Sequence, residues 1–153
     1  MIVLQEVVEV FIAPRGLQDA PSYLEVETTP YSALYASHIF NPYLNGTISH
    51  TLIACNTSGI EHFSSRDARL QKWRATIAIP WLLVNANASR SGGERAGAAQ
   101  SGDNYRVNFF RISMRNNVSS CSDSDCDYGA WSPTMRSPPS FHQPKYFGVM
   151  QLL

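Results

Sequence analysis

The feature that most constrains the fold is a series of short runs in which apolar and polar residues alternate. The clearest run, WRATIAIPW (73–81), places Trp73, Ala75, Ile77, Ile79 and Trp81 on one face, a period of two that indicates a β-strand. In SYLEVETTP (22–30), the same alternation predicts a half-buried strand. Further strands are predicted in VVEVFIAP (7–14), SALYASHIF (32–40), ISHTLIACN (48–56), YRVNFFRISM (105–114) and PKYFGVMQLL (144–153).

Glycine, proline and asparagine separate these runs. No segment has a convincing helical period, and PWLLVNANA (80–88) would form one helical turn at most. The sequence therefore predicts an all-β fold, a β-sandwich or jelly roll. Its 153 residues suit a single domain covering 1–153. Residues 85–104 are small, polar and glycine-rich, so we expect a flexible loop within that domain.

The charge balance argues against two classes of partner. Lys and Arg together number 12, as do Asp and Glu, so no cationic surplus exists to neutralise nucleic-acid phosphates or anionic lipids. No apolar run approaches the roughly 18 residues that a spanning helix needs. The first residues, MIVLQEVVEVFIAP, lack a charged leader and a cleavage site, so they do not resemble a signal peptide.

Cysteines and glycosylation motifs bear on the compartment without deciding it. Of the three cysteines, Cys121 and Cys126 in CSDSDC are the best pair; a disulfide there would imply an oxidising compartment, and reduced surface thiols are the alternative. Four Asn-x-Ser/Thr motifs favour an extracellular history and begin at Asn45, Asn56, Asn87 and Asn117. The missing signal peptide and the odd cysteine point the other way, so the localisation is left open.

No catalytic motif is visible in the sequence. Glu61 and His62 are adjacent, but neighbouring strand residues point to opposite faces, so they make a poor dyad. Asp123, Asp125 and Asp127 have the spacing that opens a calcium loop, but Gly129 arrives one residue late and Thr134 stands where a glutamate should close the loop. A solvated acidic loop is the favoured interpretation, with these aspartates as the weak metal candidates.

Aromatic residues are the remaining chemical resource. Trp and Tyr stack on the apolar faces of sugars, whose hydroxyls take polar partners. By alternation Trp73 and Trp81 face the core. Trp131 lies in the turn-rich segment YGAWSPT, where a core position and an exposed ligand platform are both open.

The blocks VVEVFI, YLEVETTP, WRATIAIPW, YRVNFFRI, YGAWSPT and FHQPKYFGVM stand in an order that resembles a family 9 carbohydrate-binding module of the DOMON-like type, closest to its fungal single-domain branch. The resemblance runs from Val7 to Leu153. It implies a jelly-roll β-sandwich that binds saccharides, or the ends of polysaccharides, without cleaving them. It also implies an association with glycoside hydrolases and carbohydrate catabolism.

The resemblance carries over to particular residues. Trp131 matches the C-terminal tryptophan of a two-tryptophan clamp around a terminal sugar, and Glu9 matches an acidic acceptor of sugar hydroxyls. Arg106, Asn108 and Arg111 lie on a strand of the family, and we take Arg111 and Asn108 as the secondary polar candidates. Calcium occurs in the family, so it is the one cofactor that the resemblance allows, although no ligand set stands out in the sequence.

Two departures from the family pattern leave alternatives open. The first tryptophan of the clamp corresponds to Val3, and the upstream strands of the family are missing, so we expect a chain truncated at its N-terminus and weak binding. One alternative is a fold-only fragment that no longer binds a ligand. The other is a haem-binding DOMON-like cytochrome domain with axial ligands from among Met114, Met135, His38, His50, His62 and His142.

Overall fold

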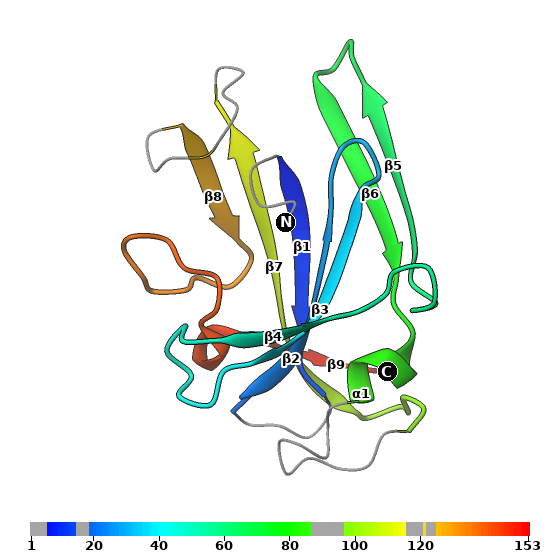
Figure 1. The fold of residues 1–153 in the computed structure, drawn as a ribbon, viewed down its shortest axis with the longest axis vertical. Helices are drawn as coiled ribbons and strands as arrows, with labels where there is room; N and C mark the ends of the chain where they lie inside the picture. Colours follow the sequence, from blue (N-terminus) through cyan, green and yellow to red (C-terminus); the bar gives the residue numbers. More distant parts are fainter. Residues whose placement is uncertain (1–5, 15–18, 87–96, 116–120, 122–124) are drawn as a thin grey trace.

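The structure, a computed structural model, is built almost entirely from antiparallel β-strands (Figure 1). It describes residues 6–14, 19–86, 97–115, 121 and 125–153. The main sheet has seven strands in the order β4-β3-β2-β1-β7-β8, and β9 also pairs with β7. Its strands are β1 (Val7–Ile12), β2 (Ser22–Thr28), β3 (Leu34–Phe40), β4 (Ser49–Leu52), β7 (Asn104–Met114), β8 (Cys126–Ala130) and β9 (Gly148–Gln151).

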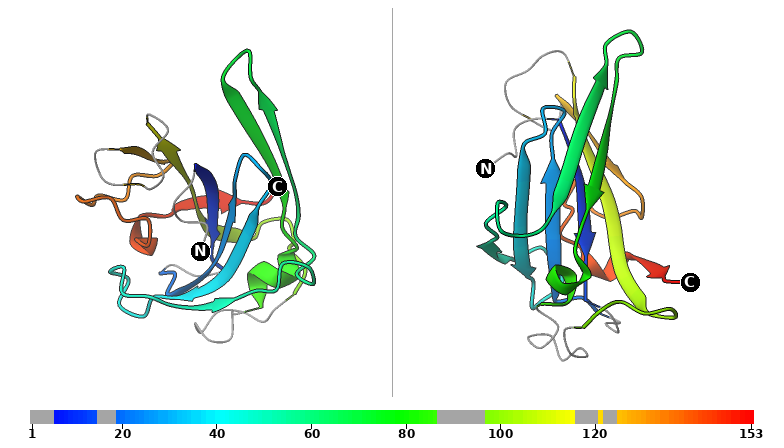
Figure 2. Two further views of the ribbon diagram at one scale, coloured as in Figure 1. Left: turned by 45° about the horizontal axis from the view of Figure 1, so that its top comes forward. Right: turned by 90° about the vertical axis from the view of Figure 1, so that its right-hand side faces the viewer.

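A separate two-stranded hairpin, β5 (Glu61–Asp67) and β6 (Lys72–Ala78), leans against one side of the main sheet (Figures 1 and 2). Its tip extends beyond the ends of the neighbouring strands in every view. A short helix, α1 (Trp81–Asn85), follows β6, and a 3₁₀ turn, η2 (Pro144–Tyr146), precedes β9. Neither helix among the described residues is long and apolar enough to cross a membrane.

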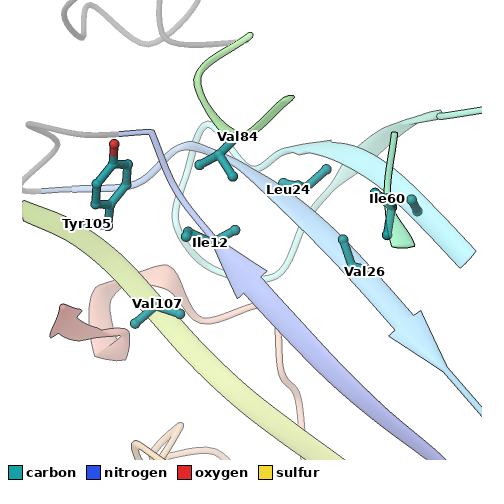
Figure 3. Close-up of a cluster of buried hydrophobic side chains, with 8 residues drawn as sticks. Ile12, Leu24, Val26, Ile60, Val84, Tyr105 and Val107 are labelled. Atoms are coloured by element: carbon teal, nitrogen blue, oxygen red, sulfur yellow. The ribbon is translucent and has the colours of Figure 1, made fainter. Parts of the chain in front are cut away.

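The main sheet is covered on both faces. On one face Leu24 and Val26 of β2 pack with Ile12 and Val107, beneath Val84 of α1, in the cluster drawn in Figure 3. On the other face Phe11, Tyr23 and Phe110 pack against Phe147, and Phe141 covers this second cluster. Because successive residues of a strand point to opposite faces, the alternation in the sequence supplies both clusters.

The predicted all-β class is confirmed. Strands form within each predicted run, and in β6 residues 73–78 alternate between half-buried and exposed as expected. Trp81 lies in α1 instead of the strand, and residues 144–146 form η2. Two strands escape the prediction: β5 is mostly polar, and β8 is short and contains a glycine.

The prediction of a half-buried β2 is wrong. All seven of its residues are buried, including Glu25 and Glu27. The alternation does divide the residues between two faces, but β2 lies between β1 and β3 inside the sheet, and both of its faces are covered. A charged residue at every second position therefore does not mark a solvent-facing side.

We expect Leu24→Ala to lower the free energy of unfolding by about 2–5 kcal/mol, because it removes buried methyl groups and leaves a cavity. Leu82→Ala is the matched control, since Leu24 is 1% exposed and Leu82 is 67% exposed. The control should change stability by less than about 0.5 kcal/mol. Urea denaturation measures both variants, and equal losses would contradict the assignment of Leu24 to the core.

Candidate functional site

Trp131 is an exposed aromatic side chain at the point where the chain leaves β8. Its backbone N–H donates to the carbonyl oxygen of Phe109 at 2.9 Å, and the residue is 58% exposed. The indole covers Gly148, at which any Cβ would overlap the ring carbons. Phe109, itself 44% exposed, meets the indole edge to face, with ring centroids 5.8 Å apart. Trp131 therefore presents a supported but open aromatic surface.

Asn108 fixes the turn that follows Trp131. Its side-chain amide donates to the carbonyl oxygen of Ser132 at 2.8 Å and accepts from the backbone N–H of Ser132 at 2.9 Å. The same amide oxygen accepts from the N–H of Phe109, and Asn108 is fully buried. Both ends of the amide are thus engaged by the backbone. The structure gives Asn108 a positioning role, whereas its predicted direct contact with a ligand stays a prediction.

Arg111 lies on the same side of the sheet as Phe109, two residues along β7. Its guanidinium forms an ion pair with Glu6 at 2.6 Å, with the two side chains 52% and 30% exposed. The indole N–H of Trp73 donates to the same Glu6 oxygen at 2.7 Å. We call the surface formed by Trp131, Phe109, Arg111, Glu6 and Trp73 the aromatic strip.

Glu9 lies on the opposite face of the sheet. It is paired with Phe110 on β7 and with Glu27 on β2. Since Phe109 and Phe110 point to opposite faces, Glu9 is separated from the indole of Trp131 by the sheet itself. The structure thus brings Trp131 and Arg111 together on one face and does not bring Glu9 to them. The predicted role of Glu9 as a hydroxyl acceptor stays a prediction.

Around Glu9 the structure assembles a cluster that the sequence analysis missed. Carboxylate oxygens of Glu9, Glu25 and Glu27 lie within 4.8 Å of one another, and each residue is only 5–6% exposed. Burial raises the pKa of Glu9 well above its usual range, and the charge of Glu27 adds to this. Burial likewise raises the pKa of Glu25 to about 8 and the pKa of Glu27 above its usual value. We call these residues the glutamate triad.

His142 closes one side of the triad. Its Nε2 lies 3.9 Å from Glu25, and its Nδ1 is 2.8 Å from the hydroxyl of Tyr23. Burial lowers the pKa of His142 to about 4 and raises the pKa of Tyr23. At neutral pH the imidazole is therefore uncharged, so His142 and Glu25 do not form an ion pair.

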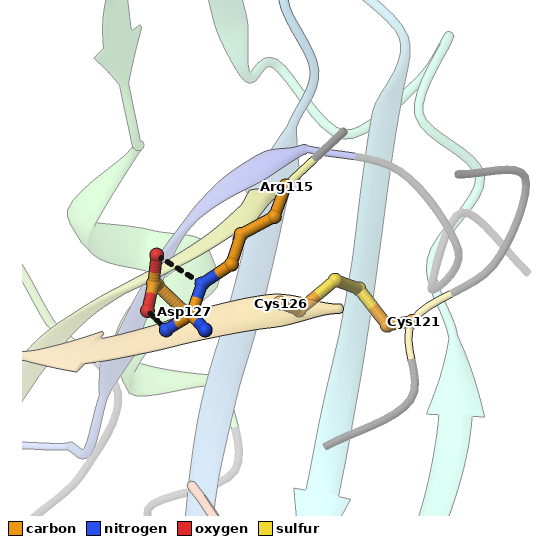
Figure 4. Close-up of a disulfide and its surroundings, with 4 residues drawn as sticks. All are labelled: Arg115, Cys121, Cys126 and Asp127. Atoms are coloured by element: carbon orange, nitrogen blue, oxygen red, sulfur yellow. Dashed lines mark hydrogen bonds and ion pairs between the residues drawn. A yellow bond between two sulfur atoms is a disulfide. The ribbon is translucent and has the colours of Figure 1, made fainter. Parts of the chain in front are cut away.

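The triad is the set of described residues whose chemistry fits a metal ion, because three carboxylates offer the oxygen ligands that calcium prefers. The aspartates expected to do so are placed differently. Asp127 pairs with Arg115 through two hydrogen bonds (Figure 4), the backbone carbonyl of Asp125 accepts from the Arg115 N–H, and Asp123 lies outside the described residues. The alternation in VVEVF and YLEVET could have shown that each run places its glutamates on one face. The sequence did not show the strand register that brings the glutamates of the two runs together.

The remaining predicted sites are the cysteine pair, whose Cys126 is buried beside Val7 and Ile112, and the glycosylation motifs. Cys121 and Cys126 form a disulfide with Cα atoms 5.5 Å apart, beside Asp127 (Figure 4), while Cys55 is free. Asn45 is exposed in a bend and Asn56 in a turn, and Asn87 and Asn117 lie outside the described residues, so glycosylation stays a prediction.

The residues proposed for the haem alternative do not gather at one point. His142 is held by Tyr23, and Nε2 of His62 lies 2.9 Å from the carbonyl oxygen of Ser32. His38 and His50 occupy β3 and β4 at positions one register step apart, which point to opposite faces. Met135 is 71% exposed.

Comparisons with known proteins agree with the fold. No protein-family model matches the sequence. The chain is 29% identical over 147 residues to an extracellular protein of Arthroderma benhamiae, a match that covers 93% of this chain and 58% of that protein. A solved structure from Bacteroides uniformis, provisionally described as carbohydrate-binding, superposes with a TM-score of 0.65 at 18% identity, covering 97% of this chain and 61% of that one. The chain thus spans about three fifths of each, and the structural match shows the fold.

We expect the glutamate triad and His142 to give stability opposite pH dependences. A carboxyl whose pKa is raised on folding contributes stability at low pH and loses it as the pH rises, here between about 4.5 and 8 for Glu25. An imidazole whose pKa is lowered loses stability as the pH falls from 6.5 to about 4. Chemical denaturation at a series of pH values should show Glu25→Gln flattening the alkaline side and His142→Asn the acidic side.

Glu61→Gln is the matched control for this series, because Glu61 is an exposed glutamate on β5. It should leave the pH profile of the free energy of unfolding unchanged. An alkaline slope as steep in Glu25→Gln as in the wild type would contradict the raised pKa of Glu25, whereas Glu9 and Glu27 are expected to leave a smaller slope. Added calcium that removes the slope from the wild type alone would place a cation at the triad.

Proposed function

We propose that this chain is a non-catalytic carbohydrate-binding domain whose ligand stacks on Trp131. The observation that carries the proposal is a tryptophan 58% exposed at a fixed position, with its ring seated on Gly148. An exposed indole held in one orientation suits the flat C–H face of a pyranose, because the side chain has little freedom left to lose on binding. The carbohydrate-binding description of the Bacteroides uniformis neighbour supports the same function.

The aromatic strip supplies the polar partners of such a ligand. Arg111 has donors beyond the one that meets Glu6, and Glu6 lies within the same surface to accept from hydroxyls. Planar guanidinium and carboxylate groups suit the paired hydroxyls of a sugar. Phe109 widens the apolar part of the surface beside Trp131. Recognition of saccharide ends in the manner of a family 9 module, and service to glycoside hydrolases, are the finer parts of the proposal.

The glutamate triad does not favour a catalytic alternative. Its carboxylate oxygens lie within 4.8 Å of one another, closer than the roughly 5–5.5 Å between the paired acids of a retaining glycosidase, and each glutamate is only 5–6% exposed. A sugar ring needs open access to both carboxyls. The triad instead shares its face of the sheet with the second core cluster, which Phe141 and Phe147 cover. The proposal is therefore binding without hydrolysis.

The expected affinity is low, because a single aromatic contact adds only about 0.5–1.5 kcal/mol beyond its area burial. We expect dissociation constants on the order of millimolar for a disaccharide. Cellobiose should quench tryptophan fluorescence in the wild type. It should also do so in the control variant Trp81→Phe, because the Trp81 indole of the wild type packs on Tyr105, with ring centroids 4.6 Å apart, outside the aromatic strip. The quench should be absent in Trp131→Ala. A quench that persists there would remove Trp131 from the site.

The same titration separates the acidic candidates. Glu6→Gln should weaken binding if the aromatic strip alone holds the ligand, and Glu9→Gln should weaken it if the residue carried over from the family resemblance contacts the sugar. Repeating the titration with the end-reduced alditol of cellobiose tests preference for a reducing end. Binding of both ligands with equal affinity would contradict recognition of that end.

Gly148→Ala tests the support beneath the indole. The new methyl group would overlap the ring of Trp131 and must displace it, so we expect cellobiose binding to fall several-fold while the protein stays folded. Gly129→Ala is the control, because its Cβ would meet its nearest neighbour, an Arg111 backbone oxygen, at an ordinary 3.8 Å. Circular dichroism checks folding. Equal affinities in the two variants would show that the seat of Trp131 on Gly148 does not matter.

A further inference from the structure

The tip of the β5–β6 hairpin concentrates positive charge in a chain whose formal net charge is zero. Between residues 66 and 74 four cations stand against one anion, a local net charge of +3, and all four are exposed: Arg66, Arg69, Lys72 and Arg74. The anion, Asp67, accepts the backbone N–H of Leu70 at 3.0 Å and so is engaged in forming the turn. The cations are therefore not neutralised by the local sequence.

The hairpin holds these cations in a defined arrangement. Register pairs Ser65 with Arg74 and Asp67 with Lys72, so Arg74 and Lys72 lie on one face, two residues apart. The guanidinium of Arg66 stacks over the ring of Tyr31 at 4.3 Å, which restrains it. A shallow concavity of about 80 Å³ opens at the tip, lined by Ser65, Arg66, Asp67, Leu70, Lys72 and Arg74.

The position of the tip favours a large partner. It extends past the ends of the neighbouring strands, so a polymer could reach it without contacting the main sheet (Figure 2). Phe63, on the same hairpin face as Arg74 and 65% exposed, adds an apolar surface beside the cations. A polymer with regularly spaced carboxylates and apolar C–H faces would match both features.

We propose that the β5–β6 tip is a second binding site, for a carboxylated polysaccharide such as a polyuronate. Lys72 and Arg74 pair with the carboxylates and Phe63, on the same hairpin face, contacts a sugar face, while Arg66 points to the opposite face and lines the concavity at its edge. The choice of a polysaccharide over an acidic polypeptide rests on the proposed carbohydrate-binding function. The inference that the partner is anionic rests only on the positive charge of the hairpin tip. The site lies outside the aromatic strip, and its ligand is anionic instead of neutral.

The test compares fluorescently labelled oligogalacturonate with its fully methyl-esterified form, which has the same backbone without the charges. We expect binding of the acidic form only, weakening as salt rises because exposed charges are screened. Lys72→Gln with Arg74→Gln should lower the affinity about tenfold. The control pair Arg136→Gln with Lys145→Gln removes the same charge from exposed positions elsewhere and should leave the affinity nearly unchanged.

Three results would overturn the proposal: equal losses in the two double variants, binding of the esterified form, or tighter binding of poly-L-glutamate, which would make the partner an acidic polypeptide. Cellobiose titration of the same proteins keeps the two sites apart. The Lys72→Gln with Arg74→Gln variant should bind cellobiose like the wild type, and Trp131→Ala should still bind oligogalacturonate. A failure of cellobiose binding alone would reject the proposed function at Trp131 and leave the hairpin site standing.

Discussion

The feature on which the candidate site depends is the divided edge of β7. Along this edge β9 pairs with residues 104–107 and β8 pairs with residues 110–114, both antiparallel. The two residues between these stretches have no strand partner on this edge, although they pair with β1 on the other. Asn108 and Phe109 occupy this gap. The Asn108 amide bonds Ser132 as a strand backbone would, and the Phe109 carbonyl accepts from Trp131. Because buried backbone groups must be satisfied, the gap requires these bonds.

This arrangement explains why an aromatic side chain stays exposed at the strand edge. At Trp131 the chain ends its pairing with β7 through β8, and at Gly148 it begins to pair with β7 again through β9. Trp131 and Gly148 therefore lie side by side along β7. A glycine at the return leaves room for the indole to lie against the backbone. The exposure of Trp131 is thus fixed by the topology of β7, β8 and β9 and does not depend on a mobile loop.

The sequence was sufficient for most strands, all but β5 and β8, and insufficient for the site. Period-two alternation marks a strand from its own residues alone and predicts β2 and β6. The runs that form β1, β3, β4, β7 and β9 were predicted from their strand-favouring residues and the turn residues that separate them. Strand register depends on partners distant in sequence, and register decides that Glu9 meets Glu25 and Glu27 while Trp131 meets Phe109. Trp131 also lies just beyond β8, where alternation no longer assigns a face. Its side of the sheet therefore follows only from its contacts.

The two faces of the sheet hold their charged residues in different ways. The glutamate triad places three carboxyls in a buried region, where desolvation favours their neutral forms. The aromatic strip keeps its ion pair, Arg111 with Glu6, partly exposed, where both charges retain water and such a pair adds little to stability. A polar ligand can replace that water, so the strip is the face better suited to reversible binding.

Trp73 connects the strip to the hairpin. Its indole bonds Glu6 on the strip, while Lys72 and Arg74, its neighbours in β6, belong to the cationic tip. Two weak sites carried on one framework act together only when one ligand spans both, since the second contact is then intramolecular and gains an effective concentration. A short neutral saccharide would engage the strip alone. Because Lys72 and Arg74 point to the hairpin face opposite Trp73, a long chain with carboxylates would engage both sites only by passing around the hairpin. Its affinity would then exceed that of either contact without any further interaction between protein and sugar.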